Sequence, residues 1–267
     1  MGSTPRVTRS TMSAKVLLID ALNLVRRIHA AVPQGDRDAL YERTQAACHK
    51  MIRHHGVSHA VMVWDGENSH AWRQGIHPEY KSHRPAMPDE LAQTLADLRQ
   101  ALDRIGIHSI SLADTEADDV LATLSDKILK AGGEVVLAST DKGFYQLHPM
   151  GVRQWNHFDQ CWMDEASCLD RFGLPPPRML EYWSLAGDSG NGIPGIPGIG
   201  AKTASRLLAE HPITDLFREG VVSGKTGERL RAGYPMAQLS YKLAKLRCGL
   251  KLDSSLNQFR IPRTTPG

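Results

Sequence analysis

The chain has 267 residues, of which 41% are hydrophobic and 23% are charged, the composition of an ordinary soluble globular protein with one large or two smaller domains. Lys and Arg number 32 against 29 Asp and Glu, so the charge balance alone does not require a polyanionic partner. The four cysteines form no CxxC pair and are too few and too dispersed for a disulfide framework, which favours a reducing compartment.

The chain opens with residues 1–13, which have no hydrophobic periodicity, and we expect them to be a disordered leader. The apolar run VLLIDALNLV that follows is interrupted by Asp20 and continues into Arg26 and Arg27. It is a poor signal peptide and is too short to cross a bilayer. We therefore predict a cytoplasmic protein with no membrane partner.

Four short apolar runs in the first half of the chain each end near a charged residue, and we predict that they are strands. Stretches of helical period lie between them. Strands that alternate with helices imply a mostly parallel sheet with helices on both faces, an α/β fold. The predicted strands are KVLLID (15–20), SHAVMVWD (58–65), GIHSISLAD (106–114) and GEVVLASTD (133–141), and the helices cover 38–55, 88–105 and 117–131.

The character of the chain changes after about residue 172, where the Pro-rich turn GLPPPRM begins a region with no convincing strand. Helical periods there cover 178–186, 200–210 and 235–249. We predict an α/β domain over residues 14–172 and a small helical domain over residues 173–267.

The stretch DTEADDVLAT, residues 114–123, holds four acidic residues within six positions. Like charges this close oppose one another. Thr115 followed by Asp118 fits a helix capping box, and acids in a first helical turn complement the helix dipole. Taken alone, the stretch favours this interpretation.

Acidic residues also follow the other predicted strands, at Asp20, Asp65 and Asp141. In a parallel sheet the carboxyl ends of all strands lie on one edge, where open α/β folds bind ligands, so these acids should meet in one crevice. Oxygen ligands without a set of His or Cys favour Mg²⁺ or Mn²⁺ over zinc. A carboxylate cluster that holds Mg²⁺ commonly serves phosphoryl chemistry, so the substrate should carry phosphate.

The segment GNGIPGIPGIGAKTASRLL, residues 190–208, is typical of a Pro/Gly hairpin followed by a helix that begins near Ala201. Backbone N–H groups of residues 198–200 would then form an anion site beside Lys202, one that a phosphodiester can approach closely. The alternative is a tight turn between helices that uses Gly and Pro for its geometry. PGIGAK before an amphipathic helix resembles the helix-hairpin-helix motif of DNA-binding proteins, which favours the anion site.

Residues 67–91, which we call the arch segment, are long, poorly periodic and rich in basic and aromatic residues. Such a segment suits a mobile lid or a loop through which a strand threads. Arg73, Lys81 and Arg84 could meet backbone phosphates while Tyr80 stacks on a base. Taken alone, the segment is equally well an ordinary solvated loop.

Six stretches together resemble the bacterial 5′-nucleases, or flap endonucleases, over about residues 14–250. DALNLVRRIHA and STDKG look most like the stand-alone exonuclease IX type of that family. The six stretches occur in the family's order and spacing and are IDALNL (19–24), WDGE (64–67), EYKSHRPAMP (79–88), EADD (116–119), STDKG (139–143) and GIPGIPGIGAKTA (192–204).

The resemblance implies a Mg²⁺-dependent nuclease of DNA replication or repair that acts on DNA with 5′ flaps or free 5′ ends. It also implies roles for residues at matching positions. The first metal cluster would comprise Asp20, Asp65, Glu116, Asp118 and Asp119, and part of a second would comprise Asp141 and Asp188. The basic residues thought to act on the scissile phosphate would be Arg27, Lys81 and Arg84, with Tyr80 beside them.

The hairpin resembles the duplex-binding element of the family, a helix-hairpin-helix or helix-three-turn-helix. The resemblance implies a potassium ion there that bridges to a DNA phosphate. Its ligands would be the main-chain carbonyls of Leu185, Ala186, Pro194, Ile196 and Ile199. The residues in contact with the DNA backbone would be Gly198, Ile199, Gly200, Ala201, Lys202 and Thr203.

The chain departs from the family pattern at the second metal cluster. Where many relatives have STDxD, this chain has Gly143, and where they have GDxxDNIPG it has Asn191 and Gly192. The loss of two carboxylates should weaken a second cation, so we expect low activity or a demand for high Mg²⁺.

We therefore predict a monomeric, structure-selective 5′-nuclease that reads the shape and phosphates of DNA. One alternative is a DNA-binding module that recognises flaps or gaps with little or no cleavage, which the depleted second cluster favours. The other is an RNA-directed nuclease on a related acidic α/β domain, although the hairpin suits duplex DNA better.

Overall fold

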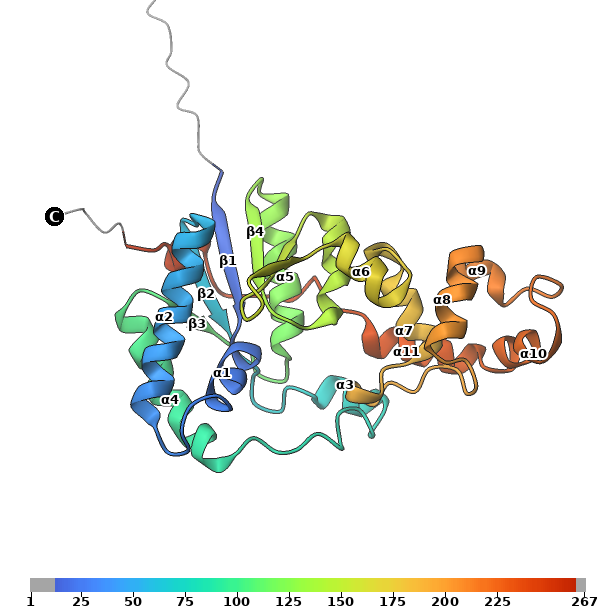
Figure 1. Cartoon of the computed structure of the whole chain (residues 1–267), viewed down its shortest axis with the longest axis horizontal. Coiled ribbons are helices and arrows are strands. Elements are labelled where there is room, and N and C mark those ends of the chain that lie inside the picture. Colours follow the sequence, from blue (N-terminus) through green and yellow to red (C-terminus); the bar gives the residue numbers. More distant parts are fainter. Residues whose placement is uncertain (1–12, 263–267) are drawn as a thin grey trace, which may run out of the picture.

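A computed structural model describes residues 13–262 of the chain. Figure 1 shows an elongated molecule with a sheet covered by helices at one end and a helical region at the other. All but the last residue of the predicted leader, residues 1–13, lie outside the described part.

The sheet has six strands in the order β3-β2-β1-β4-β5-β6. All neighbouring strands pair in parallel except the last two, which form an antiparallel hairpin that the sequence did not predict. The four predicted strands are all present and the mostly parallel α/β fold is confirmed. The strands are β1 (Lys15–Asp20), β2 (His59–Val63), β3 (His108–Ile110), β4 (Glu134–Ala138), β5 (Arg153–Asn156) and β6 (Cys161–Met163).

Helices cover both faces of the sheet because successive residues of a strand point to opposite faces. Leu17 and Ile19 of β1 belong to one hydrophobic core, and Val16 and Leu18 belong to another. The first core is covered by α1 (Ala21–His29), α2 (Arg37–His55) and α4 (Asp89–Arg104), and the second by α5 (Ala117–Lys130) and the 3₁₀ helix η1 (Lys142–Met150).

The helical region packs around a third core, in which Trp183 and Leu207 lie with Met163 and Cys168 of the preceding segment. The predicted helices at 178–186 and 200–210 are observed within one residue of their ends, whereas the one predicted at 235–249 ends at Ala244. The elements are α6 (Glu165–Phe172), η2 (Pro176–Arg178), α7 (Met179–Ala186), η3 (Ser189–Asn191), α8 (Ala201–Glu210), α9 (Ile213–Leu216), α10 (Gly224–Ala232) and α11 (Tyr234–Ala244).

After α11 the chain leaves the helical region and runs back along the α/β domain. Phe259, in the short helix η4 (Leu256–Phe259), is buried in the second core. Arg260 forms an isolated antiparallel bridge with His59 at the start of β2. Residues 245–262, predicted as part of the helical domain, therefore pack on the sheet domain instead.

Cys48, Cys161, Cys168 and Cys248 are all free thiols. Within residues 13–262, none of the helices is both long enough and apolar enough to span a membrane.

Candidate metal and nucleic-acid site

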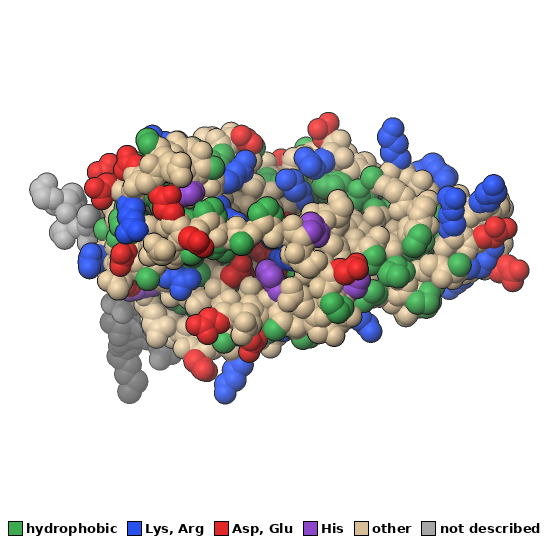
Figure 2. Space-filling model, turned by 90° about the horizontal axis from the view of Figure 1, so that it is seen from below, with side chains coloured by type: hydrophobic (Ala, Val, Ile, Leu, Met, Phe, Trp, Pro, Cys, Tyr) green, Lys and Arg blue, Asp and Glu red, His purple; other side chains and the backbone are tan. Residues whose placement is uncertain are grey.

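The acidic residues that follow the strands lie at the carboxyl edge of the sheet. Asp20 ends β1, is 7% exposed, and accepts a hydrogen bond of 2.8 Å from the Ser139 hydroxyl beyond β4. Its other oxygen accepts the Asn23 N–H at 3.2 Å and so caps α1. Figure 2 looks onto this edge of the molecule and shows acidic side chains in a hollow near the middle of the face.

The start of α5 is capped from across this edge. The N–H of Ala117 donates to the carboxylate of Asp65, which follows β2, at 2.7 Å. The Thr115 hydroxyl donates to the carbonyl of Ala113 at 3.1 Å and does not cap the helix. The predicted capping box of Thr115 and Asp118 is therefore wrong, because the helix begins one residue later, with Glu116 at the N-cap position.

Burial and mutual repulsion raise the pKa values of carboxyl groups at this edge. Burial, reinforced by the charges of Asp141 and Asp65, raises the pKa of Asp20 to about 7. Burial also raises the pKa of Asp118 well above its usual value, and the charges of Asp141 and Asp20 add to the shift. Carboxylates crowded in this way are stabilised as anions by a cation among them.

The donor set fits a hard divalent cation in its chemistry, since every candidate ligand is a carboxylate oxygen. Within residues 13–262, however, no three His, Cys, Asp or Glu side chains stand close enough together to hold one ion as placed. The residues at this edge that could hold the ion are Asp20, Asp65, Asp118 and Asp141.

Asp119 does not face this edge, and its predicted role as a metal ligand is wrong. Its carboxylate is fully buried and each oxygen accepts two hydrogen bonds, from the guanidinium of Arg73 at 2.9 and 2.9 Å and from Arg247 N and Nε at 3.0 and 2.8 Å. A carboxylate offers about four acceptor positions, so no position remains for an ion. Adjacent helical side chains point about 100° apart, which directs Asp118 to the edge and Asp119 into the interior.

The negative charge of Glu116, which was also predicted as a ligand, is balanced by side chains of the arch segment. Lys81 and Arg73 form ion pairs with its two oxygens, the Tyr80 hydroxyl donates at 3.2 Å, and His70 Nδ1 lies 3.1 Å away. Burial alone would raise the pKa of Glu116, but the hydrogen bond from His70 and the charges of Lys81 and Arg73 hold the pKa well below its usual range. Glu116 therefore stays ionised.

The arch segment packs against the acidic edge through the short helix α3 (Ala71–Ile76). Tyr80 is 4% exposed and Arg73 is 3% exposed. Their predicted contacts, Tyr80 stacked on a base and Arg73 on a phosphate, are therefore wrong for this arrangement. Both side chains are held inside because Glu116 is buried and needs their hydrogen bonds.

Lys81 and Arg84 connect the arch segment to η3. Lys81 adopts a left-handed φ of 53°, which is costly for a residue with a Cβ, and its N–H donates to the Asn191 carbonyl at 3.0 Å. The Arg84 guanidinium donates to the Asn191 side chain and to the Gly190 carbonyl, the latter at 3.3 Å. Arg27 is exposed on α1 and lies 4.4 Å over the ring of Phe158.

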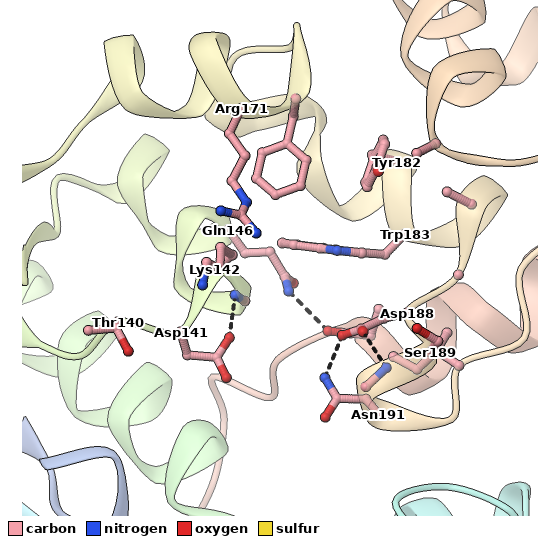
Figure 3. A pocket seen from close by; sticks show the side chains of 18 of the residues that line it. Thr140, Asp141, Lys142, Gln146, Arg171, Tyr182, Trp183, Asp188, Ser189 and Asn191 are labelled. Carbon is pink, nitrogen blue, oxygen red and sulfur yellow. Dashed lines mark hydrogen bonds between the residues drawn. The ribbon is translucent and has the colours of Figure 1, made fainter. Parts of the chain in front are cut away.

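A cavity of about 610 Å³ lies between the end of β4 and η3. Figure 3 shows Asp141 on one side of it and Asp188 on the other. The side chains of Lys142 and Arg171 extend into it and Trp183 forms part of its wall. The fold therefore brings Asp141 and Asp188, both predicted for a second metal cluster, to the same cavity.

The two carboxylates of this cavity are bound by donors of their own loops. Asp141 accepts the Gly143 N–H at 2.6 Å. Asp188 accepts the Gly190 N–H at 3.0 Å and the Asn191 amide at 2.6 Å. An aspartate at position 191 could not donate this last bond, so Asn191 supplies a donor where the family pattern has a negative charge.

In the hairpin, the pattern of buried side chains and of backbone conformation recurs at every third residue. Its isoleucines are buried, and its glycines have positive φ, which glycine adopts without strain. A Cβ on Gly195 would lie 2.4 Å from the nitrogen of Gly187, so the hairpin packs backbone to backbone against the end of α7. The isoleucines are Ile193, Ile196 and Ile199, and the glycines are Gly192 (67°), Gly195 (64°) and Gly198 (78°).

This packing presents the start of α8 to solvent. The helix begins at Ala201, as predicted, and Lys202 beside it is exposed. The first N–H groups of a helix have no partner inside it and favour anions. The guanidinium of Arg229, which the sequence did not single out, donates to the Gly198 carbonyl at 3.3 Å and adds a positive charge.

The predicted potassium ligands lie where the hairpin meets α7. The carbonyl of Leu185 accepts the Ile196 N–H at 2.8 Å, and the carbonyl of Ile196 accepts the Ile199 N–H at 2.9 Å. A carbonyl oxygen has a second lone pair, so a further ligand is compatible with these bonds. The potassium site stays a prediction.

Asn23 is a further site residue that sequence reasoning missed. Its amide donates to the Thr140 hydroxyl at 3.0 Å and accepts the Thr140 N–H at 3.0 Å. This pair ties α1 to the segment that carries Asp141. The residues are 117 positions apart, so spacing within a motif gives no signal for the contact.

Two family models meet within this chain. The model described as 5′-3′ exonuclease, N-terminal resolvase-like domain, matches residues 15–173. The model described as 5′-3′ exonuclease, C-terminal SAM fold, matches residues 174–266.

Similar proteins include a flap endonuclease Xni of Shewanella amazonensis, 44% identical over 250 residues that cover 92% of this chain and 98% of that protein. A flap endonuclease Xni of Shewanella sp. (strain W3-18-1) is 46% identical over 253 residues, which cover 94% and 96%.

Among solved structures, a T5 5′-exonuclease with bound divalent metal ions superposes with a TM-score of 0.75 at 19% identity, over 86% of this chain and 89% of that one. The bacteriophage T5 D15 flap endonuclease in complex with DNA and metal ions superposes with a TM-score of 0.70 at 20% identity, over 86% and 88%. At these identities the likeness shows a shared fold.

Proposed function

This chain belongs to the 5′-3′ exonuclease family, and we propose on that premise that it is a structure-selective 5′-nuclease of the flap endonuclease type. It hydrolyses phosphodiester bonds of DNA that carries a free 5′ end. The observation that carries this assignment is the acidic edge, where the charges of neighbouring carboxylates raise the pKa values of Asp20 and Asp118. Carboxylates held together against their own repulsion favour a divalent cation.

We propose Mg²⁺ as that ion, with Mn²⁺ as a substitute, because both prefer oxygen ligands. The ion, when bound, supplies positive charge to the phosphate oxygens and acidity to water. The ligands would be the four carboxylates of the acidic edge, and Asp141 with Asp188 would hold any second ion more weakly. Glu116, bound by Lys81 and Arg73, would hold the arch segment beside the edge.

Lys81 and Arg84 would steady negative charge as it develops on the scissile phosphate. Burial alone would lower the pKa of Lys81, but the charges of Asp118 and Glu116 outweigh burial and raise it, so its ammonium stays protonated. Arg84 is exposed at the cavity and its guanidinium is oriented by Asn191. Arg27 would extend this basic surface from α1.

The hairpin would bind duplex DNA through its sugar–phosphate backbone. Residues 198–203 would donate N–H groups to a phosphate, with Lys202 adding a charge. A potassium ion at the carbonyls of residues 185, 186, 194, 196 and 199 would bridge to the same strand. Binding of this kind reads shape and phosphates, so we propose that a monomer acts in the cytoplasm on 5′ flaps of any sequence.

The assignment is tested with a labelled 5′-flap DNA and its single-stranded control, each incubated with Mg²⁺ or with EDTA. The flap is cut in Mg²⁺ and stays intact in EDTA, and it is cut faster than the single strand. An intact flap in Mg²⁺ over a range of concentrations would contradict the assignment.

The second candidate is a flap- or gap-binding module with little cleavage. It is favoured by the cavity, where Gly143 and Asn191 replace two carboxylates of the family pattern and donate hydrogen bonds to the remaining two. Tight binding of the flap in EDTA, with no metal-dependent product at high protein concentration, would select this candidate.

A further inference from the structure

Arg73 lies at the junction of the arch segment, the start of α5 and the end of α11. Its guanidinium is buried, and two of its N–H groups donate to carbonyls at the end of α11, to Leu243 at 2.9 Å and to Lys245 at 3.1 Å. The last carbonyls of a helix have no partner inside it. Arg73 therefore caps α11, which belongs to the helical region.

The other three N–H groups of Arg73 donate to acids at the start of α5. Two reach the two oxygens of Asp119, both at 2.9 Å, and one reaches Glu116. All five donors of the guanidinium are thereby used, in the planar forked geometry that only arginine offers. Burial alone would lower the pKa of Arg73, but the hydrogen bonds that it donates to Asp119 and the charge of Glu116 raise the pKa, so the ion pair stays charged.

Arg247 completes the arrangement from the segment that follows α11. Its N–H and its Nε–H donate to Asp119 at 3.0 and 2.8 Å. Asp119 is thus enclosed by two arginines, one from the arch segment and one from the segment that follows α11. We call Arg73, Asp119 and Arg247 the clamp.

We propose that Arg73 is a positioning residue, which through the clamp fixes the metal-binding edge to the DNA-binding helical region. The proposal rests on the proposed function. Asp118 lies between Glu116 and Asp119 in the first turn of α5, so its carboxylate is placed by the two neighbours that Arg73 holds. Breaking a buried pair leaves an uncompensated charge, and the turn must shift to relieve it.

The test compares Arg73→Lys and Asp119→Asn with the wild type. Lysine keeps the charge but offers three donors from one nitrogen, and asparagine cannot accept at both atoms. The control is Arg99→Lys. Arg99 is partly buried and is not part of the clamp, and its guanidinium lies 4.5 Å from the centre of the Trp64 ring. Three quantities are measured: Mn²⁺ affinity by calorimetry on the protein alone, flap binding in EDTA, and flap cleavage in saturating Mg²⁺.

Both clamp variants are expected to weaken Mn²⁺ binding and to slow cleavage by roughly 10–100-fold, the loss typical of residues that orient metal ligands. The Arg99→Lys variant keeps wild-type Mn²⁺ affinity and cleavage. All three variants retain flap binding in EDTA, because the hairpin is unchanged.

Wild-type Mn²⁺ affinity in both clamp variants would overturn the proposal. A loss in Asp119→Asn alone, with Arg73→Lys normal, would also overturn it, since Asp119 would then hold the ion directly. If Arg73→Lys does not fold, Arg247→Gln at the clamp's 26% exposed member takes its place, and a weaker Mn²⁺ affinity supports the proposal while an unchanged one overturns it. A wild type that binds Mn²⁺ but leaves the flap uncut contradicts the nuclease assignment and not the clamp.

Discussion

Two parts of the site hold carboxylates in opposite ways. In the inner edge, formed by Asp20, Asp65 and Asp118, carboxyl groups are crowded and two of them have raised pKa values. In the outer pocket, Asp188 and Asp141, which also borders the acidic edge, are partly exposed and accept hydrogen bonds from Gly143, Gly190 and Asn191. The inner edge therefore needs a cation to stabilise its anions, whereas the outer pocket is stabilised by neutral donors. From this difference we expect one tightly held ion and one weakly held ion.

The largest effect is expected at the inner edge. Asp118→Asn should reduce flap cleavage by at least about 100-fold, because it removes a charge that the ion needs. This loss is larger than the loss caused by substituting residues that only orient metal ligands. Gel-based cleavage in Mg²⁺ measures the loss, and flap binding in EDTA should be unchanged.

The matched control for this variant is Asp114→Asn in the same acidic stretch. Asp114 is exposed and has a left-handed φ of 53°, which asparagine tolerates. Cleavage should be close to that of the wild type. An equal loss in both variants would mean that general acidity of the stretch, and not the inner edge, supports cleavage.

At His55, a buried group outside the acidic edge, the effect of burial on a pKa can be separated from the effect of crowded charges. His55 packs against Trp155 and Trp162, and burial, reinforced by the charge of His54, lowers its pKa to about 4. Because the pKa is lowered on folding, the unfolded chain binds the proton more readily than the folded chain. The free energy of unfolding is therefore highest above the pKa of histidine in the unfolded chain, about 6.5, and it falls as the pH is lowered toward 4.

At pH 5 the wild type should have lost about 2 kcal/mol relative to pH 7.5 through this residue, and His55→Phe should lose that much less. Urea unfolding in EDTA at the two pH values gives the difference, with His49→Phe on the same helix as the control. Equal acid sensitivity in His55→Phe and the wild type would show that burial here carries no such cost, and would weaken the inference drawn from burial at the inner edge.

A smaller effect is expected when the outer pocket is made to resemble the inner edge. The double variant Gly143→Asp, Asn191→Asp restores two carboxylates, and a Cβ at position 143 would lie 3.1 Å from Asp141 Oδ1, close enough for the new acid to share an ion. The Mg²⁺ concentration for half-maximal cleavage should fall roughly tenfold, equivalent to about 1.4 kcal/mol. An unchanged Mg²⁺ requirement would remove the distinction between the two parts.

The smallest effect is expected outside both parts, at the hairpin. Lys202→Ala should weaken duplex binding a few-fold for all sequences and flatten its salt dependence by about one charge. Binding measured between low and moderate salt gives the slope. Lys130→Ala, which removes an exposed lysine paired with Asp126 on α5, should leave the slope unchanged. A matching change in both variants would count against the hairpin as the duplex contact.

The sequence predicted the elements whose hydrophobic pattern is strong. β1 and β4 are continuous apolar runs, and their strands are observed as predicted. The hairpin of β5 and β6 was missed because its strands have four and three residues, too few for alternation to stand out. α1 was missed because VLLIDALNLV reads as one apolar run, although Asp20 ends the strand and caps the helix within it.

The sequence predicted the location of the candidate site but not the ion pairs and hydrogen bonds within it. Strand order alone brings Asp20, Asp65 and Asp141 to one edge. Which of two adjacent acids faces that edge depends on the helix phase at Glu116, and this phase is set by arginines 43 or more positions away. Long-range ion pairs leave no local pattern, so Asp119 was assigned to the metal, and the buried roles of Arg73 and Tyr80 could not be predicted.

The return of the chain after α11 makes the helical region an insertion and not an appendage. Phe259 fills the core beneath the sheet, and the Ile261 N–H donates to the Ser58 carbonyl at 3.1 Å. Truncation after α6 would therefore remove Phe259 and the rest of the returning segment from the second core, along with the helices. To isolate the α/β domain, the helices α7 to α11 would have to be deleted and a short linker placed between α6 and the returning segment.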